Sequence, residues 1–225
     1  MYERVWKRVL DFGLSLTALV FLSPVLLVLM VVGAMVMKGN PFFTQIRPGK
    51  NEKLFRLIKF RSMTCETDGN GNLLPDEKRL TAYGRFLRAS SLDELPELLN
   101  ILKGDMSIVG PRPQLVRDMV FMTPEQRGRH QVRQGLTGLA QVNGRNGITW
   151  EQKIEYDLRY IEKITFWGDV RIIFQTVKKV FVRDGISAEG MDTAEDLGDY
   201  LLRTGRVTAS DYEEKQMEAK QLLHV

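Results

Sequence analysis

The sequence predicts a mainly helical α+β protein, in which an N-terminal membrane segment precedes a small cytoplasmic globular domain. Three observations support this fold class. Residues 12–37 are 26 consecutive residues without a charge, two short segments of strand-like alternation follow, and the second half of the chain carries apolar residues at helical spacing. We expect a membrane anchor at 1–40, a globular domain at 41–185 and an acidic extension at 186–225.

The composition excludes several protein classes. The chain has 225 residues with one cysteine, Cys65, and two histidines, His130 and His224. These residues cannot form an internal disulfide or, by themselves, a zinc site. The net charge of +4 is unevenly distributed: residues 184–225 carry ten acidic and four basic residues, so the preceding part carries +10. A basic body indicates an anionic partner, such as a nucleotide, a nucleic acid or a lipid surface.

The uncharged run is long enough for a membrane helix, which needs about 20 apolar residues. Ser23-Pro24 lies at its centre, and a proline there removes a backbone donor and kinks the helix. Basic residues flank both ends, which favours the cytoplasmic side for both. The sequence therefore predicts a re-entrant hairpin broken at Ser23-Pro24, with arms of about 12 residues and about 18 Å each. A kinked span is the alternative, and the hairpin requires Ser23 or neighbouring protein to satisfy the carbonyls that the proline frees.

Two short strands are predicted at 41–50 and 53–63, around a turn at 48–51. In the second strand Lys59 and Arg61 alternate with apolar residues, so both basic side chains should project from one face. A solvated strand face explains this pattern as well as a binding face does. A polar loop with an Asn-Gly turn follows at residues 66–78.

A helix start is predicted within residues 90–102, with Ser91 as N-cap and Glu94 completing a capping box. This interpretation explains Asp93 and Glu94 by structure alone, since acidic residues favour the first helical turn. The functional alternative is that the two carboxylates face the basic strand and Arg88. There they would hold a divalent cation, and the aspartate could act as a nucleophile toward phosphorus.

A rigid turn follows at residues 103–113, where a short strand leads into Pro-Arg-Pro. The guanidinium of Arg112 is a planar fork of donors suited to phosphate, and the flanking prolines limit its backbone freedom. Residues 135–147 are glycine-rich and are interpreted as a short strand and turn. They form either a structural loop or a loop that closes over a ligand. Three polar side chains alternate across the strand and turn: Gln141, Asn143 and Arg145.

Two helices are predicted at 150–163 and 168–182. The second has an apolar face and several basic residues, so it is either a packed core helix or an amphipathic helix lying on anionic lipid. In the acidic tail a second capping-box pattern, Ser210 to Glu213, predicts a terminal helix at 214–223. We interpret this tail as a packing or self-association element, with a homodimer as one expected consequence.

Four ordered motifs carry a family resemblance: Lys59-Phe-Arg-Ser-Met63, Ser91-Leu-Asp-Glu-Leu-Pro96, the segment 103–113 and the segment 135–146. Over about residues 1–185 the chain resembles the bacterial sugar transferase family, the monotopic phosphoglycosyl transferases. It is most similar to the short PglC-type enzymes that begin glycan assembly for protein glycosylation. Two residues depart from the family pattern, which usually has tryptophan at the place of Leu139 and proline at the place of Gln134.

The resemblance implies transfer of a sugar 1-phosphate from a UDP-sugar to polyprenol (undecaprenyl) phosphate, with release of UMP. It implies that Asp93 is the nucleophile, forming a covalent phosphosugar intermediate, and that Asp93 and Glu94 bind Mg²⁺. It also implies a monotopic protein on the cytoplasmic face of the bacterial inner membrane, re-entrant at Ser23-Pro24. The expected phosphate- and substrate-binding residues are basic: Lys59, Arg61, Arg88, Arg112 and Arg145.

Several alternatives remain at this stage. The PglC resemblance favours a UDP-N-acetylated dideoxy sugar such as UDP-diacetylbacillosamine, whereas a hexose such as galactose or glucose would serve capsule or exopolysaccharide synthesis. A non-catalytic membrane-tethered scaffold would not need Asp93, Lys59 and Arg112 together. No nucleic-acid-binding module is recognisable, so nucleic acid is not an expected partner. The expected partners are a UDP-sugar, polyprenol phosphate and inner-membrane lipid.

Overall fold

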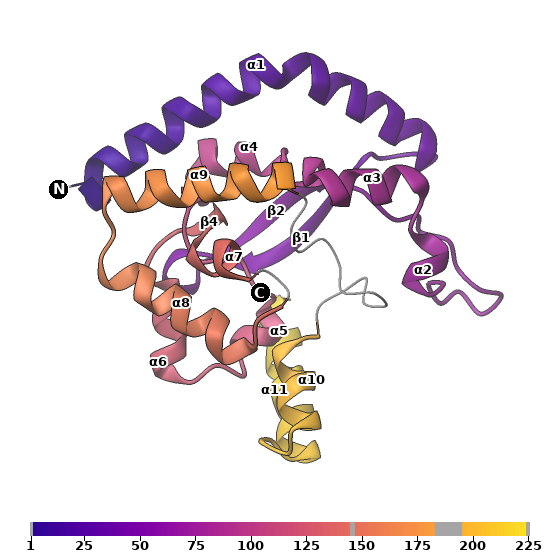
Figure 1. Cartoon of the computed structure of the whole chain (residues 1–225). Helices are drawn as coiled ribbons and strands as arrows, with labels where there is room; N and C mark the ends of the chain where they lie inside the picture. The colour runs from indigo at the N-terminus through magenta and orange to yellow at the C-terminus, as the bar shows by residue number, and fades with distance from the viewer. Residues whose placement is uncertain (1, 145–146, 183–194, 224–225) are drawn as a thin grey trace.

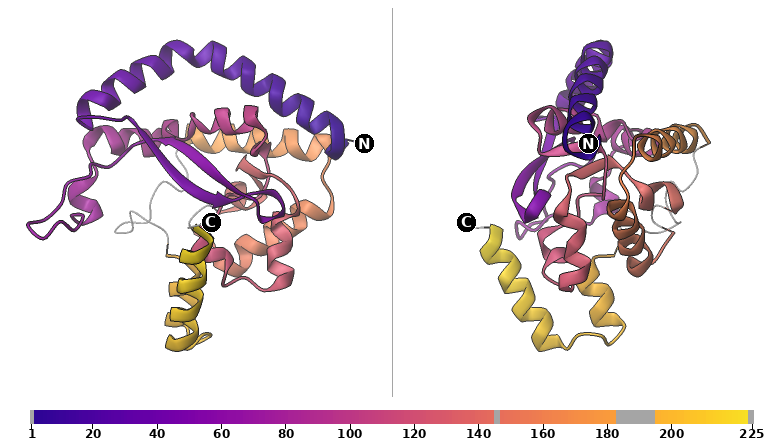
Figure 2. Two further views of the ribbon diagram at one scale, coloured as in Figure 1. Left: turned by 180° about the vertical axis from the view of Figure 1, so that it is seen from behind. Right: turned by 90° about the vertical axis from the view of Figure 1, so that its left-hand side faces the viewer.

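The computed structural model describes residues 2–144, 147–182 and 195–223 and has a mainly helical α+β fold with two small sheets (Figure 1). Helix α1 (Lys7–Val36) arches over one side of the molecule. Beneath the arch lie α3 (Ala82–Ser90), α4 (Glu97–Lys103) and α9 (Phe166–Val182), and the other helices lie farther from α1 (Figures 1 and 2). This arrangement places one layer of helices between the arch and the remainder of the domain.

The two predicted strands are confirmed. Strands β1 (Phe42–Pro48) and β2 (Leu54–Phe60) form an antiparallel hairpin in which Phe43 lies opposite Lys59. The connecting turn contains the 3-10 helix Lys50–Glu52. A second sheet pairs β3 (Met106–Val109) in parallel with β4 (Gln134–Thr137), so the segment after β3 and the segment after β4 leave the sheet in the same direction.

Helix α1 does not break at Pro24 but continues through it, which corrects the predicted interruption. The carbonyl of Val20, four residues earlier, loses its helical donor because proline has no N–H. The Ser23 hydroxyl donates to this same oxygen over 2.8 Å. The requirement that Ser23 satisfy a freed carbonyl is therefore met locally, and the helix bends without ending.

Both ends of α1 are held by the body of the protein. At the N-terminal end Lys7 forms an ion pair with Asp169 at 2.6 Å, and buried Asp11 accepts hydrogen bonds from the side chain and backbone of β3. At the other end the Tyr83 hydroxyl donates to the Leu29 carbonyl over 2.7 Å. The two ends of the arch consequently lie on the same side of its apex (Figure 1).

The remaining described helices are short, apart from α8 and α11. The predicted strand and turn across Gln141 and Asn143 is wrong, because Leu139–Asn143 is helical. Leu139 and Val142 both pack into one apolar cluster, and a spacing of three places them on one face only in a helix. The helices not yet named are α2 (Asp76–Arg79), α5 (Val116–Met119), α6 (Pro124–Arg127), α7 (Leu139–Asn143), α8 (Trp150–Glu162), α10 (Leu197–Arg203) and α11 (Ala209–Leu223).

The C-terminal helices α10 and α11 pack on α5 and α8 as part of one apolar core. The backbone N–H of Leu197 donates to Asp118, and Lys215 donates to the Val120 carbonyl. The cap of α11 lies two residues earlier than predicted: the Thr208 hydroxyl, not Ser210, accepts from the helix backbone. The extension therefore shares its core with the segment that follows Arg112.

We expect Gly198→Ala to loosen this packing. A Cβ at position 198 would lie 2.6 Å from Cε2 of the Phe121 ring, which belongs to the same core. Overpacking of this kind costs about 1–3 kcal/mol, so the melting temperature should fall measurably. Gly69→Ala is the matched control, because a Cβ there meets nothing within 4 Å. Equal melting temperatures for the two variants would show that α10 is not docked in solution.

Candidate active site

Strand β2 is joined to α4 by a buried asparagine. The Asn100 side chain donates to the Arg56 carbonyl over 2.8 Å and accepts from the Ile58 N–H over 3.1 Å. These two bonds fix the end of β2 against α4. The next residue on the strand, Lys59, is thereby placed beside the acidic segment that precedes and begins α4.

Lys59 lies between two carboxylates. Its Nζ is 2.9 Å from Glu94 Oε1 and 3.1 Å from Glu97 Oε1. Arg112 approaches Glu94 from the Pro-Arg-Pro turn, and its Nη2 donates to Glu94 Oε1 over 2.5 Å. Side chains from two separate segments, β2 and the Pro-Arg-Pro turn, therefore converge on Glu94.

The predicted capping box at Ser91 and Glu94 is wrong. Ser91 ends α3 in the left-handed conformation with φ of 56°, and its hydroxyl caps neither neighbouring helix. Asp93 and Glu94 lie in a 3-10 turn, Leu92–Glu94, and α4 begins only at Glu97. The Glu94 carboxylate binds the cations Lys59 and Arg112 instead, because two opposite charges close by attract it more strongly than one neutral backbone N–H does.

Asp93 differs from Glu94 in its partners. Among the described residues, none donates a hydrogen bond to the Asp93 carboxylate. Burial, followed by the neighbouring charge of Glu94, raises the pKa of Asp93, against the opposing effect of Lys59, Arg112 and Arg88. A carboxylate with a raised pKa is more basic and hence a better nucleophile than an ordinary aspartate.

The pKa values of the other two carboxylates of the site are shifted in opposite directions. Burial works against the charge of Glu94, but Arg112 and Lys59 outweigh it and lower the pKa of Glu94. Burial raises the pKa of Glu97 to about 7, with Glu94 adding to the effect and Lys59 opposing it. The functional interpretation did not include Glu97. Its signal in the sequence was a third acid, one helical turn after Glu94.

The other basic residues predicted for the site form no hydrogen bond or ion pair with Glu94 among the described residues. Arg88, on α3, donates from Nε to the Ser62 hydroxyl over 3.0 Å. Gly84 permits this close approach of α3, since a Cβ there would lie 1.8 Å from the Ser62 carbonyl oxygen. Arg61 follows β2 directly, and no hydrogen bond or ion pair links its side chain to another described residue. Arg145 lies outside the described residues, so its role stays a prediction.

The carboxylates of the described site suit a magnesium ion whose coordination is completed by substrate phosphate. The described residues contain no group of three or more His, Cys, Asp or Glu that could hold a metal ion. Mg²⁺, however, commonly binds one or two carboxylates plus substrate phosphates. No described residue donates a hydrogen bond to the Asp93 carboxylate, and the one described partner of Glu94 Oε2 is Arg112 Nη1, at 3.5 Å. The donor set therefore fits Mg²⁺ completed by phosphate oxygens.

Comparison with known proteins agrees with the family resemblance. EpsL, an uncharacterized sugar transferase of Bacillus subtilis, is 48% identical over 195 residues, which cover 85% of this chain and 95% of that protein. A UDP-glucose:undecaprenyl-phosphate glucose-1-phosphate transferase of Klebsiella pneumoniae is 42% identical, covering 79% of this chain and 40% of its own length. An undecaprenyl-phosphate galactose phosphotransferase of Salmonella typhimurium is 36% identical, covering 81% and 42%.

The chain thus spans less than half of the two named phosphotransferases and nearly all of EpsL. The family model for bacterial sugar transferases matches residues 2–183, which include every described residue of the site. The convergence of Asp93, Glu94, Lys59 and Arg112 and the extent of this match lead to one conclusion: the chain belongs to the bacterial sugar transferase family.

Proposed function

We propose that this protein transfers a sugar 1-phosphate from a UDP-sugar to undecaprenyl phosphate and releases UMP. The observation that carries the proposal is the contrast between two neighbouring carboxylates. Lys59 and Arg112 hold Glu94 in place, whereas no described residue donates a hydrogen bond to the carboxylate of Asp93. Cations thus fix Glu94, and the Asp93 carboxylate, which accepts no hydrogen bond from a described residue, keeps its lone pairs for reaction. The names of two relatives, a glucose-1-phosphate transferase and a galactose phosphotransferase, support the same reaction class.

The reaction follows in two steps. An Asp93 carboxylate oxygen attacks the phosphorus that bears the sugar, and the phosphoanhydride bond to UMP breaks as the new bond forms. A phosphate oxygen of undecaprenyl phosphate then attacks the same phosphorus and releases Asp93 as a free carboxylate. Charge on the transferring group would be balanced by Lys59, Arg88 and Arg112. Mg²⁺ held by Asp93 and Glu94 would neutralise further phosphate charge.

The exposed apolar surface of helix α1 supports a monotopic arrangement. Residues Tyr2–Val36 make the one described helix that is long and apolar enough to cross a membrane, and only 11% of its most apolar window is buried. Its ends both return to the body of the protein (Figure 1). We propose that α1 enters one leaflet and returns, with both ends on the cytoplasmic face of the inner membrane.

Helix α9 fits the interfacial interpretation. Trp167 and Phe174 are 76% and 74% exposed, while Ile172 packs into the core. The helix lies in the layer directly beneath the arch of α1 (Figures 1 and 2). An exposed aromatic face at that level suits the boundary between lipid headgroups and acyl chains, so α9 would lie along the membrane surface.

The sugar is proposed from the relatives. Their names favour a UDP-hexose, glucose or galactose, whereas nothing in them favours UDP-diacetylbacillosamine. The test is UMP release from a panel of UDP-sugars in detergent with undecaprenyl phosphate. We expect turnover with one UDP-hexose. Absence of UMP release with every sugar would contradict the proposed reaction and support the non-catalytic scaffold.

Cysteine labelling tests the topology. The exposed native Cys65 is first replaced by serine, and single cysteines are then placed at the exposed positions Glu3 and Gly39. A membrane-impermeant thiol reagent should label both positions in inside-out vesicles and neither in intact spheroplasts. Labelling of the two positions from opposite sides would establish a full span and exclude the re-entrant arrangement.

A further inference from the structure

The Pro-Arg-Pro turn is held mainly through its carbonyl oxygens. Pro111 and Pro113 have no N–H, so neither can donate a hydrogen bond to the rest of the protein. The Pro111 carbonyl accepts from the Gly135 N–H over 2.8 Å. The Arg112 carbonyl accepts from Nη2 of Arg129 over 2.7 Å. The orientation of the Arg112 backbone therefore depends on a side chain from a distant segment.

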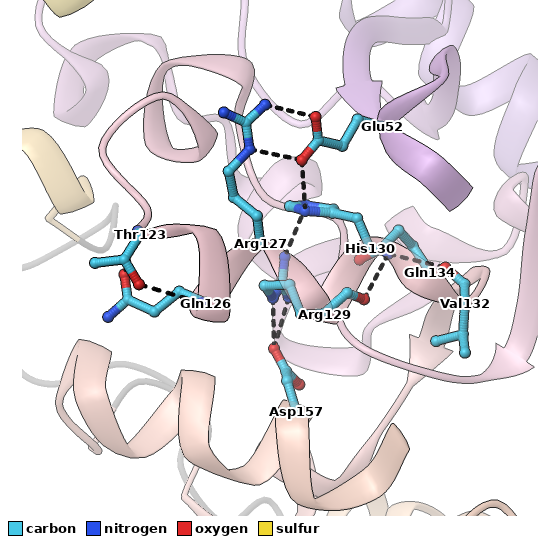
Figure 3. A network of polar contacts seen from close by, with 9 residues as sticks. All are labelled: Glu52, Thr123, Gln126, Arg127, Arg129, His130, Val132, Gln134 and Asp157. Atoms are coloured by element: carbon cyan, nitrogen blue, oxygen red, sulfur yellow. Dashed lines mark hydrogen bonds and ion pairs between the residues drawn. The ribbon is translucent and has the colours of Figure 1, made fainter. Parts of the chain in front are cut away.

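Arg129 is fully buried and is itself fixed. Its Nε and Nη2 donate to the same oxygen of Asp157, Oδ2, over 2.9 and 2.6 Å (Figure 3). Asp157 lies on α8 and is also buried, so the two charges neutralise each other away from water. A buried ion pair requires good geometry to offset its desolvation, which restricts the guanidinium to a narrow range of orientations.

The neighbours of Arg129 do not compete for Asp157. His130 lies beside it, with Nε2 3.5 Å from Arg129 Nη1, and burial followed by the charge of Arg129 lowers the pKa of His130 to about 3. This histidine is neutral near pH 7 and adds no second cation. The Gln134 side chain donates to the backbone carbonyl of Arg129 over 3.4 Å (Figure 3). Arg129 is thus held at both its backbone and its guanidinium.

We propose that Arg129 and Asp157 are positioning residues for the transfer reaction, acting through Arg112. Asp157 orients Arg129, Arg129 holds the Arg112 carbonyl, and the Arg112 guanidinium holds Glu94 beside the reacting Asp93. This inference rests on the proposed function. Misplacement of a binding group by about 1 Å can cost up to about 100-fold in rate, so even a small shift of Arg112 should be measurable.

The test uses Arg129→Lys and Asp157→Asn in the full-length chain. A lysine has one nitrogen in place of the two that contact Asp157, and the asparagine removes the charge that fixes Arg129. We expect kcat/KM for UMP release to fall about 10-fold or more in each variant. In an Arg112→Ala background, the same substitutions should cause no further fall, because the group that they position is already absent.

The chain offers a matched control in the pair Arg127 and Glu52. This pair is also joined by two hydrogen bonds, of 2.6 and 2.5 Å, although each nitrogen donates to a different oxygen of Glu52 (Figure 3). It belongs to the same polar network, and none of the contacts among the described residues joins it to Arg112. Arg127→Lys and Glu52→Gln should leave kcat/KM unchanged. Losses of Arg129→Lys and Arg112→Ala that multiply in the double variant would show a general structural role and overturn the proposal.

Folding and function are separated by two further readouts. If Arg129→Lys does not fold, Asp157→Asn alone tests the proposal, since asparagine preserves the shape of the aspartate side chain. Because Pro111 and Pro113 have no N–H, the turn is followed through the segment directly after it, residues 114–119. Hydrogen exchange of this segment should increase in the folded variants. Unchanged exchange together with unchanged kcat/KM would contradict the proposal. If the wild-type protein releases no UMP, the proposed reaction fails, and the exchange measurement still tests whether Arg129 holds this turn.

Discussion

Asp93→Asn is expected to lower UMP release by roughly 10⁴-fold or more, the scale seen when a covalent nucleophile is removed. The asparagine keeps the shape of the side chain but replaces the carboxylate with a weakly nucleophilic amide. With UDP-sugar and no lipid acceptor, the wild-type protein should release about one equivalent of UMP and gain the mass of a sugar phosphate. The variant should do neither.

Asp68→Asn is the control for this experiment. Asp68 lies in the exposed loop between β2 and α2, where its carboxylate accepts hydrogen bonds from the backbone of Asn70 and Asn72. Its substitution should leave UMP release unchanged. Full turnover of Asp93→Asn in the presence of Mg²⁺ would exclude the covalent mechanism proposed for this protein.

Lys59→Met is expected to destabilise the protein by about 3 kcal/mol or more, because it removes the cation shared by two largely buried carboxylates. The substitution leaves Glu94 with Arg112 alone and Glu97 without its ion-pair partner. At about pH 8, adding Glu97→Gln to this variant should restore part of the lost stability, since the buried Glu97 no longer has to carry an uncompensated charge or take up a proton. Urea denaturation in detergent measures both effects, with the exposed Lys50→Met as control.

The loss of stability in Lys59→Met should also depend on pH, and the direction of this dependence follows from the pKa of Glu97. The pKa of Glu97 rises from its ordinary value of 4.5 to about 7 in the folded protein, so the folded state binds the proton more tightly. Stability from this group is therefore present below pH 4.5 and is lost as the pH rises toward about 7. Without Lys59 the pKa of Glu97 should rise further. The defect of Lys59→Met should accordingly be smaller near about pH 6 than near about pH 8.

Local sequence patterns predicted the elements whose residues interact with near neighbours. The β1–β2 hairpin follows from alternation over a few residues, and α8 and α9 follow from apolar residues at helical spacing. The same kind of argument was misleading at Ser91 and Glu94, because the capping-box motif is defined by four adjacent residues and takes no account of distant partners. The partners that Glu94 actually binds are Lys59, 35 residues away, and Arg112, 18 residues away.

The sequence by itself determined that this chain carries a long apolar segment, a basic body and the ordered motifs of a sugar transferase. These properties depend on the type and order of residues along the chain, and they can be read without knowing how distant segments pack. The tertiary structure alone decided that α1 bends through Pro24 without ending and that Glu97 joins the Lys59 site. It also decided that Arg129 holds the Arg112 carbonyl. Each of these depends on hydrogen-bond geometry or ion pairing at short range, and in the last two the partners meet only when distant segments of the chain pack together.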